Sequence, residues 1–308
     1  MLKVRLLQNH YLIKIIIMKF ENKHKGLLLA FVGVLFITPD SLFIRLVGKS
    51  GINSWELMFY RGLVPFLCLF ILLLFIYKKN FVKTCLAIGY AGVLNAVLVA
   101  LGNITFVASI ENTNVANTLI MISLAPFMAA IFSSIFLKEY PNIRTWITML
   151  FCFIFVVYIF YDSYETQKLL GDILGFATAI IIGASSVVIR YGKLTNFLPS
   201  LMLGKIFTMI FTIFFINSLV LESSDIMLIL VMGIFFVFVP ISLITLAPRY
   251  IAAHQVQLFF VLETALGPIW VWYFINERPS DKTIIGGIAI ILIIFIYTIL
   301  ESSDKKTS

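Results

Sequence analysis

Apolar residues fill the chain in long runs, each bounded by charged residues, Pro, Gly or Asn. A helix needs about 20 apolar residues to cross the hydrocarbon core of a bilayer, and most of the runs have that length. No soluble domain or sheet fits between them. The pattern predicts an all-α membrane protein with ten transmembrane helices, at residues 26–47, 55–77, 84–107, 115–136, 145–161, 171–191, 197–220, 226–247, 255–274 and 283–300.

The composition supports this interpretation. Apolar residues make up 61% of the chain and charged residues 12%, against roughly 45–50% and about 25% in ordinary soluble domains. A soluble fold of 308 residues cannot bury so much apolar surface and keep a polar exterior. In lipid, every backbone polar group must be satisfied within the segment, which favours helices throughout. The lipid bilayer is therefore the first predicted partner.

Lys and Arg are distributed unevenly between the two sides of the predicted spans. Fifteen lie in the N-terminal tail and in connections on the same side as that tail. Only Lys49, Lys168, Arg278 and Lys282 lie in the opposite connections. Positively charged loops stay in the cytoplasm, so we expect an inner-membrane protein with both termini cytoplasmic. The net charge of +8 is scattered over loops, which argues against a nucleic-acid partner.

The N-terminal tail is short and basic. Residues 1–17 are too interrupted to form a span, and a compact basic flank follows Met18. We expect translation to start at Met18; a short amphipathic surface helix is the alternative. The predicted organisation is a cytoplasmic tail at 1–25, a first repeat at 26–161, a second repeat at 171–300 and a cytoplasmic tail at 301–308.

The two repeats share short motifs in the same order, at offsets of 138 to 145 residues. The matches are Ser41 and Arg45 with Ser186 and Arg190, Arg61 with Lys205, and Glu139, Pro141 and Thr145 with Glu277, Pro279 and Thr283. A repeat of five helices has an odd number, so the second copy has the opposite orientation. Inverted repeats are a common plan of secondary transporters, with the substrate site near the midplane at the repeat interface.

Several motifs resemble those of one known family. They are 38–46 (TPDSLFIRL), 59–63 (FYRGL), 113–117 (TNVAN), Ala125-Pro126, Lys138-Glu139, 262–270 (LETALGPIW) and Asn276-Glu277. In order and spacing, over residues 26–300, they resemble the EamA-type ten-helix members of the drug/metabolite transporter superfamily. One departure is Leu262-Glu263-Thr264, where many members have Leu-Glu-Pro; here the proline is Pro268.

The resemblance implies a carrier of a small organic metabolite, often an exporter of amino acids or related compounds. It also implies a cavity lined by spans one, three, four, six, eight and nine. Uptake, or exchange of a nucleotide-like or other metabolite, is the alternative. The sequence has no Walker A motif, so we expect a proton or solute gradient to drive transport, or transport to run downhill. Protons are the candidate coupling ion. The substrate, the direction of transport and the oligomeric state stay open.

Enzymatic and scaffold functions are remote alternatives. The three histidines lie in flanks or loops, and there is no HExxH motif and no pair of intramembrane aspartates with GxGD spacing. The cysteines, Cys68, Cys85 and Cys152, lie in apolar runs without metal-ligand spacing, and are interpreted as small buried hydrophobic residues. We therefore expect no catalytic residue, no metal and no cofactor.

Charged residues inside predicted spans mark candidate functional positions, because they are costly unless they face protein or water. Glu263 is the foremost candidate, since it lies near the middle of the ninth span, opposite Ala125 in the repeat. Its carboxylate suits a substrate ammonium group or a coupling proton; a structural hydrogen bond is the alternative. Asp40 follows Pro39, which bends a helix and frees a carbonyl, so it either lines the cavity or pairs with a basic residue.

Uncharged polar residues and one tryptophan complete the binding candidates: Asn117, Gln255, Asn95, Asn103 and Trp270. The amides could bind a zwitterion or hold helices together. Trp270 could stack on a ligand or belong to an interfacial aromatic belt. Four cations are instead interpreted as gating or structural charges: Arg45, Arg61, Arg190 and Lys205.

Overall fold

The computed structural model describes residues 24–140, 142–165, 168–192, 196–216, 219, 221, 223–251, 256 and 259–304. All regular secondary structure in these residues is helical. After a first helix that starts at His24, the elements are α2 (Asp40–Lys49), α3 (Ser54–Tyr77), η1 (Lys78–Asn80), α4 (Phe81–Leu86), α5 (Gly89–Asn112), α6 (Val115–Ile122), α7 (Ala125–Phe132), η2 (Ser133–Leu137), α8 (Ile143–Glu165), α9 (Leu169–Tyr191), α10 (Leu198–Thr212), η3 (Ile213–Phe215), α11 (Ser223–Val231), η4 (Met232–Phe238), α12 (Val239–Leu246), η5 (Ala247–Arg249), α14 (Phe260–Ile275) and α15 (Asp281–Asp304).

Within these residues, seven helices are long and apolar enough to cross a membrane. They are His24–Lys49, Ser54–Leu86, Gly89–Asn112, Val115–Leu137, Leu169–Tyr191, Leu198–Phe215 and Asp225–Arg249. Three more apolar helices, α8, α14 and α15, have 23, 16 and 24 residues. Many large apolar side chains point outward, for example Phe75 and Phe214. Such a surface suits hydrocarbon rather than water as the surrounding medium.

Two of the long helices are broken near their middle. Turn residues at Thr38 and Pro39 separate the first helix from α2, and the Thr38 hydroxyl donates to the Leu35 carbonyl at 3.0 Å. Proline has no N–H to donate to the preceding turn, which explains this break. Ser123 and Leu124 separate α6 from α7, whose second residue is Pro126. Polar groups freed at such breaks are tolerated in a membrane only where protein or a cavity surrounds them.

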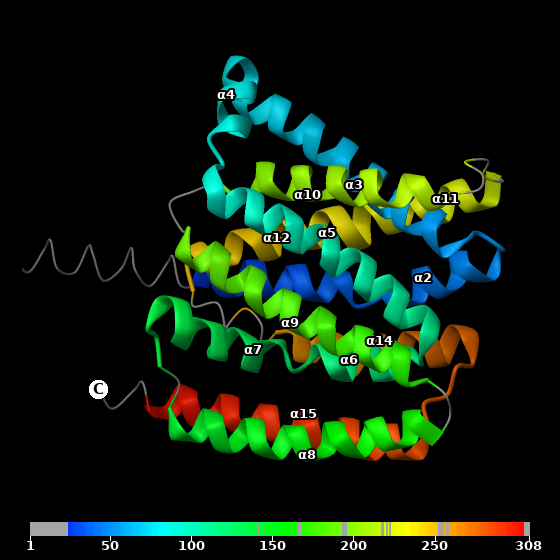
Figure 1. The fold of residues 1–308 in the computed structure, drawn as a ribbon, viewed down its shortest axis with the longest axis vertical. Coiled ribbons are helices and arrows are strands. Elements are labelled where there is room, and N and C mark those ends of the chain that lie inside the picture. Colours follow the sequence, from blue (N-terminus) through cyan, green and yellow to red (C-terminus); the bar gives the residue numbers. More distant parts are fainter. Residues whose placement is uncertain are drawn as a thin grey trace, which may run out of the picture.

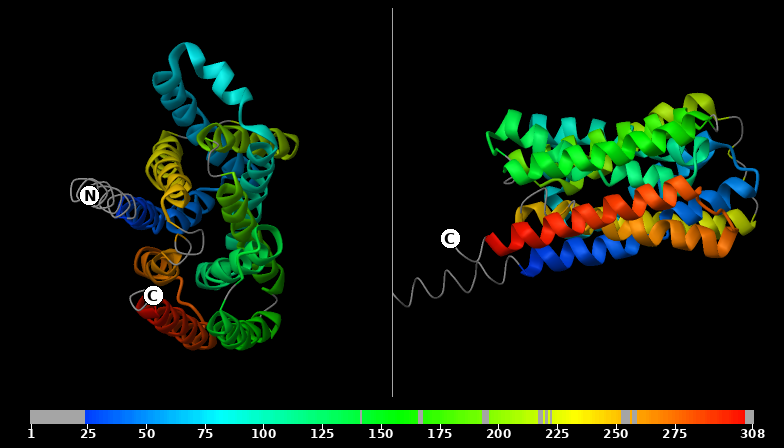
Figure 2. Two further views of the ribbon diagram at one scale, coloured as in Figure 1. Left: turned by 90° about the vertical axis from the view of Figure 1, so that its left-hand side faces the viewer. Right: turned by 90° about the horizontal axis from the view of Figure 1, so that it is seen from below.

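The helices lie roughly parallel and pack in neighbouring pairs (Figure 1). α5 packs against α9 and α10, and α10 also packs against α3. α14 contacts both α2 and α6, so an element of the second half lies against the first half. α8 and α15 pack together at one edge, and the left view of Figure 2 places them far from α3 and α4.

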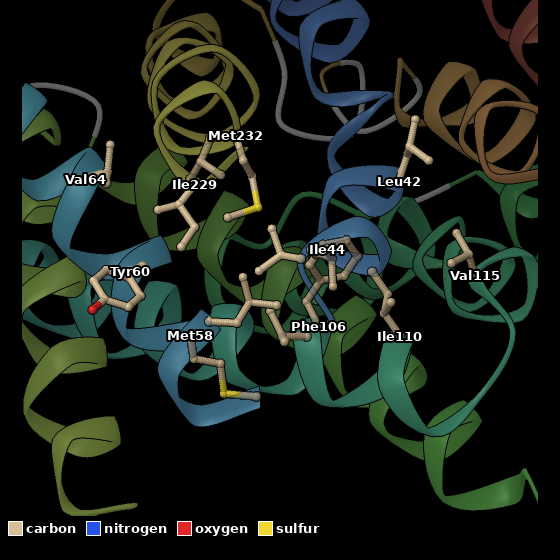
Figure 3. Packing of buried hydrophobic residues seen from close by; sticks show 14 of the residues in the cluster. Leu42, Ile44, Met58, Tyr60, Val64, Phe106, Ile110, Val115, Ile229 and Met232 are labelled. Carbon is tan, nitrogen blue, oxygen red and sulfur yellow. The ribbon is translucent and has the colours of Figure 1, made fainter. Parts of the chain in front are cut away.

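The largest apolar core lies where the two halves of the chain meet. Figure 3 shows Ile44 of α2, Met58 of α3, Phe106 of α5 and Met232 of η4 gathered there. Burial of these side chains fixes α2 against its neighbours just beyond the break at Pro39. The break and the residue that follows it therefore occupy a fixed position inside the protein.

The helices begin and end close to the predicted boundaries, with two informative differences. The third long helix starts at Gly89, not at 84, because η1 and α4 occupy residues 78–86 and Gly89 adopts a positive φ of 62°. α14 starts at Phe260, which places Glu263 in its first turn rather than near the middle of a helix. Gln255, predicted to start this span, lies outside the described residues.

Close packing of α9 on α7 requires a glycine at position 183. A Cβ atom at Gly183 would lie 2.8 Å from the backbone nitrogen of Ala129, closer than any ordinary contact. We predict that Gly183→Ala destabilises the protein by about 1–3 kcal/mol, as overpacking does. Gly48→Ala is the control, because nothing lies within 4 Å of its Cβ position and alanine is the better helix former. Thermal unfolding in detergent measures both; equal midpoints would contradict the prediction.

Candidate functional site

A cavity of about 190 Å³ lies between the two halves of the chain. Most of its wall is apolar, from helices α5, α9, α10 and α12 and from η4. Its charged lining consists of Asp40, Arg61, Lys205 and Glu263, and Asn103 joins them. The cavity is the candidate site because it gathers opposite charges inside otherwise apolar helices.

The break at Pro39 places Asp40 at the first position of α2, where its side chain is fully buried. Arg61 of α3 forms two parallel contacts with it, Nη1 to Oδ1 at 2.5 Å and Nη2 to Oδ2 at 2.9 Å. Paired carboxylate–guanidinium contacts of this kind are among the stronger hydrogen bonds in proteins. The two charges satisfy each other where both residues are buried.

Two groups on α5 complete the surroundings of Arg61. Its Nε donates to the Oδ1 of Asn103 at 3.2 Å, and its guanidinium carbon lies 5.7 Å from the centre of the Phe106 ring. Asn103 and Phe106 are three residues apart and therefore share one face of the helix. Asn103 was identified from the sequence and Phe106 was missed, although the spacing places both on one face of the helix.

Lys205 and Glu263 differ from this pair. Their side chains are 2% and 4% exposed and line the same cavity from α10 and α14. Among the described residues neither side chain takes part in an ion pair or a hydrogen bond. Buried ionisable groups normally need a partner, and the cavity wall holds an amino group and a carboxyl group that have none among the described residues.

Asn95 lies outside the cavity wall, in a hydrogen-bonded link between three helices. Its Nδ2 donates to Ser200 of α10 at 3.0 Å, and Ser185 of α9 donates to its Oδ1 at 2.7 Å. The Ser200 hydroxyl in turn donates to the carbonyl of Gly92 at 2.6 Å. This geometry favours the structural interpretation of Asn95.

Asn117 lies in a second buried cluster, away from the cavity. Its Nδ2 is 3.3 Å from each carboxylate oxygen of Asp172, and Thr283 donates to its Oδ1 at 2.7 Å. Thr113 donates to the same carboxylate at 2.7 Å. The cluster joins α6, α9 and α15. This geometry favours the interpretation that Asn117, like Asn95, holds helices together.

The remaining sequence candidates lie outside the cavity wall. Trp270 donates from Nε1 to Thr38 at 3.2 Å and stacks on Phe274, which links α14 to the break before Pro39. Arg45 and Arg190 each form an ion pair with a glutamate, Glu277 and Glu139 respectively. In the part of the chain that the structure describes, no group of three or more His, Cys, Asp or Glu residues could hold a metal ion.

The long apolar helices and the cavity between the two halves are typical of a multi-pass membrane protein. The chain belongs to the EamA-like transporter family, whose model matches residues 24–161 and again residues 169–299. The protein is thus a multi-pass membrane protein of a transporter family, with two copies of one repeat. This confirms the family predicted from the sequence motifs.

Comparison with solved structures shows the same fold elsewhere. A structure titled "Crystal structure of protein" is similar with a TM-score of 0.65, over 90% of this chain and 98% of the other. The two sequences are 14% identical, so this likeness concerns the fold alone. No curated protein matches the sequence.

The buried Asp40–Arg61 pair leads to a prediction about the stability of variants that remove one or both charges. Asp40→Asn or Arg61→Gln alone leaves a buried charge without its partner, which costs about 3–5 kcal/mol. The double variant removes both charges, so we expect it to lose less stability than the sum of the single variants. Thermal unfolding in detergent measures all three.

The control for this prediction is Asp281→Asn, which breaks the exposed Arg278–Asp281 pair. Exposed pairs contribute little, so the unfolding midpoint should stay close to that of the wild type. Additive losses in the double variant would show that Asp40 and Arg61 do not stabilise each other.

Proposed function

We propose that the protein is a secondary transporter that moves a small organic metabolite across the inner membrane by alternating access. An amino acid or a related zwitterion is the favoured cargo, and export is the favoured direction. The observation that carries the proposal is the cavity between the repeats, with Lys205 and Glu263 both buried in its wall. Family membership supports transport of a small solute.

The chemistry of the cavity supports a zwitterion. A substrate carboxylate would bind Lys205 and a substrate ammonium group would bind Glu263, so that each buried charge acquires a partner. The rest of the wall is mainly apolar and suits an apolar side chain. A volume of about 190 Å³ is below the roughly 300–1,000 Å³ of sites for drug-sized ligands. These features favour an amino acid over a nucleotide.

We also propose the predicted topology of ten spans in two inverted repeats. The seven helices that meet the criteria for a span, together with α8, α14 and α15, provide ten crossings. The family matches divide the chain between residues 161 and 169, and five crossings then fall on either side. The excess of Lys and Arg on one side supports cytoplasmic termini.

Counterflow in proteoliposomes tests the function. Vesicles containing the purified protein and an unlabelled solute are mixed with the same solute in labelled form, over a panel of amino acids, nucleotides and other metabolites. We expect saturable uptake for a zwitterion with an apolar side chain. A panel without saturable flux for any solute would contradict the assignment as a carrier.

Two variants test the site. Glu263→Gln and Lys205→Met each remove one charge, and we expect counterflow to fall at least about tenfold, the effect of losing a charge-assisted hydrogen bond of about 1.5–3 kcal/mol. The matched controls are Asp281→Asn and Lys83→Met, at exposed positions, which should retain wild-type flux. Unchanged flux in Glu263→Gln would remove this carboxylate from the mechanism.

The same variant separates two roles for Glu263. A carboxylate that binds the substrate ammonium group is needed for counterflow and for accumulation driven by a proton gradient. A carboxylate that only carries a coupling proton is needed for accumulation alone, because counterflow requires no net proton movement. Since Glu263 lines the cavity beside Asp40 and Arg61, we expect both activities to fall.

A further inference from the structure

Two ion pairs join the halves of the chain at opposite ends of the helices. Arg45, near the end of α2, pairs with Glu277, which follows α14. Arg190, near the end of α9, pairs with Glu139, which follows η2. Figure 1 shows α2 and α14 ending on the right and α9 ending on the left. Each pair thus takes its arginine from one half and its glutamate from the other.

The two pairs are copies of each other in the repeat. Arg45 and Arg190 follow Ser41 and Ser186 by four residues, and Glu139 and Glu277 match at an offset of 138. The backbone before the two glutamates is the same as well. Lys138 and Asn276 both end a helix in the left-handed conformation, with φ of 57° and 59°. The same local geometry therefore presents a carboxylate at each end.

The pair at the Arg45 end is closely engaged. Arg45 Nε lies 3.0 Å and Nη2 lies 3.2 Å from the two carboxylate oxygens of Glu277. Arg45 also donates to the carbonyl of Thr113 at 2.7 Å, and Glu277 accepts from the backbone N–H of Val115 at 3.0 Å. The carboxylate caps the start of α6, where a negative charge is favourable. Helices α2, α6 and α14 are joined at this end.

The pair at the Arg190 end is looser. Its one ion-pair contact, from Arg190 Nη2 to Glu139 Oε1, measures 3.6 Å. The two side chains are 30% and 51% exposed, against 23% and 22% for Arg45 and Glu277. The cavity wall extends toward this end, to Ile189, the neighbour of Arg190. None of the residues that join the helices at the Arg45 end belongs to that wall.

We propose that these two ion pairs are reciprocal gates: the Arg45–Glu277 pair closes one end of the cavity, the Arg190–Glu139 pair closes the other, and they engage in alternation. The conformation described here has the Arg45 end closed and the Arg190 end loosened. Movement to the opposite conformation breaks the first pair and tightens the second. The inference rests on the proposed alternating access and adds to it the residues that hold each state.

The test uses a reporter cysteine in the cavity wall. Cys68, Cys85 and Cys152 are replaced by Ala, and Ile181→Cys supplies a thiol in the wall. A membrane-impermeant maleimide is added to intact cells or to inside-out vesicles, so that each face is probed separately. The readout is the ratio of labelling rates from the two faces. In the parent protein, which keeps both ion pairs, labelling should be faster from the Arg190 face.

The same substitution at the two equivalent positions should move this ratio in opposite directions. Glu277→Gln keeps an oxygen for the Val115 N–H but removes the charge, which destabilises the described state. We expect the ratio to shift toward the Arg45 face by about tenfold. Glu139→Gln destabilises the other state and should shift the ratio further toward the Arg190 face. The double variant should return toward the ratio of the parent protein.

Opposite shifts are a result that a general loss of stability does not produce. Shifts in the same direction, or an unchanged ratio in Glu277→Gln, would overturn the gating proposal. Labelling needs no substrate, so the two proposals can fail separately. Saturable counterflow with an unresponsive ratio would refute the gates alone, whereas opposite shifts without flux for any solute would support the gates and refute the carrier function.

Discussion

Hydrocarbon offers no hydrogen-bond partner, and this constraint governs the structure. Long helices satisfy the backbone within each segment, and side-chain charges must be paired or gathered around a cavity. The Asp40–Arg61 pair shows the consequence. The break at Pro39 would expose polar groups to lipid at the surface of the bundle. Here it lies inside, and the carboxylate after it meets a guanidinium held by Asn103.

The charges at the cavity and in the Asp172 cluster have three different environments. Asp40 and Arg61 satisfy each other. Lys205 and Glu263 line the same space and have no ion-pair partner among the described residues. Asp172 lies in a cluster of neutral donors from Thr113 and Asn117. Of these three environments, the second has ionisable side chains without a partner, which is why the proposed substrate chemistry rests on Lys205 and Glu263.

The two repeats match at several positions, and the sequence departs from this match at one of the positions proposed for binding. Glu263 corresponds to Ala125, whereas Lys205 corresponds to another cation, Arg61. The symmetric residues, Arg45 and Arg190 with Glu277 and Glu139, lie instead at the ends of the helices. Equivalent groups at opposite ends suit a movement that exchanges two similar states, whereas unlike groups at the cavity suit one particular ligand.

The sequence by itself determined the helices, the two repeats and the family. The length of an apolar run and the spacing of motifs are local properties, which can be read directly from one chain. Glu263 and Asp40 could be selected for the same reason, since a charge inside an apolar run is visible without a structure. Only the tertiary structure decided which charges meet. Pairing depends on the rotation and contact of helices that are far apart in sequence. The tertiary structure placed Arg61 and Lys205 at the cavity, and Arg45 and Arg190 at the ends of helices. It also placed Asn95 and Asn117 in links between helices.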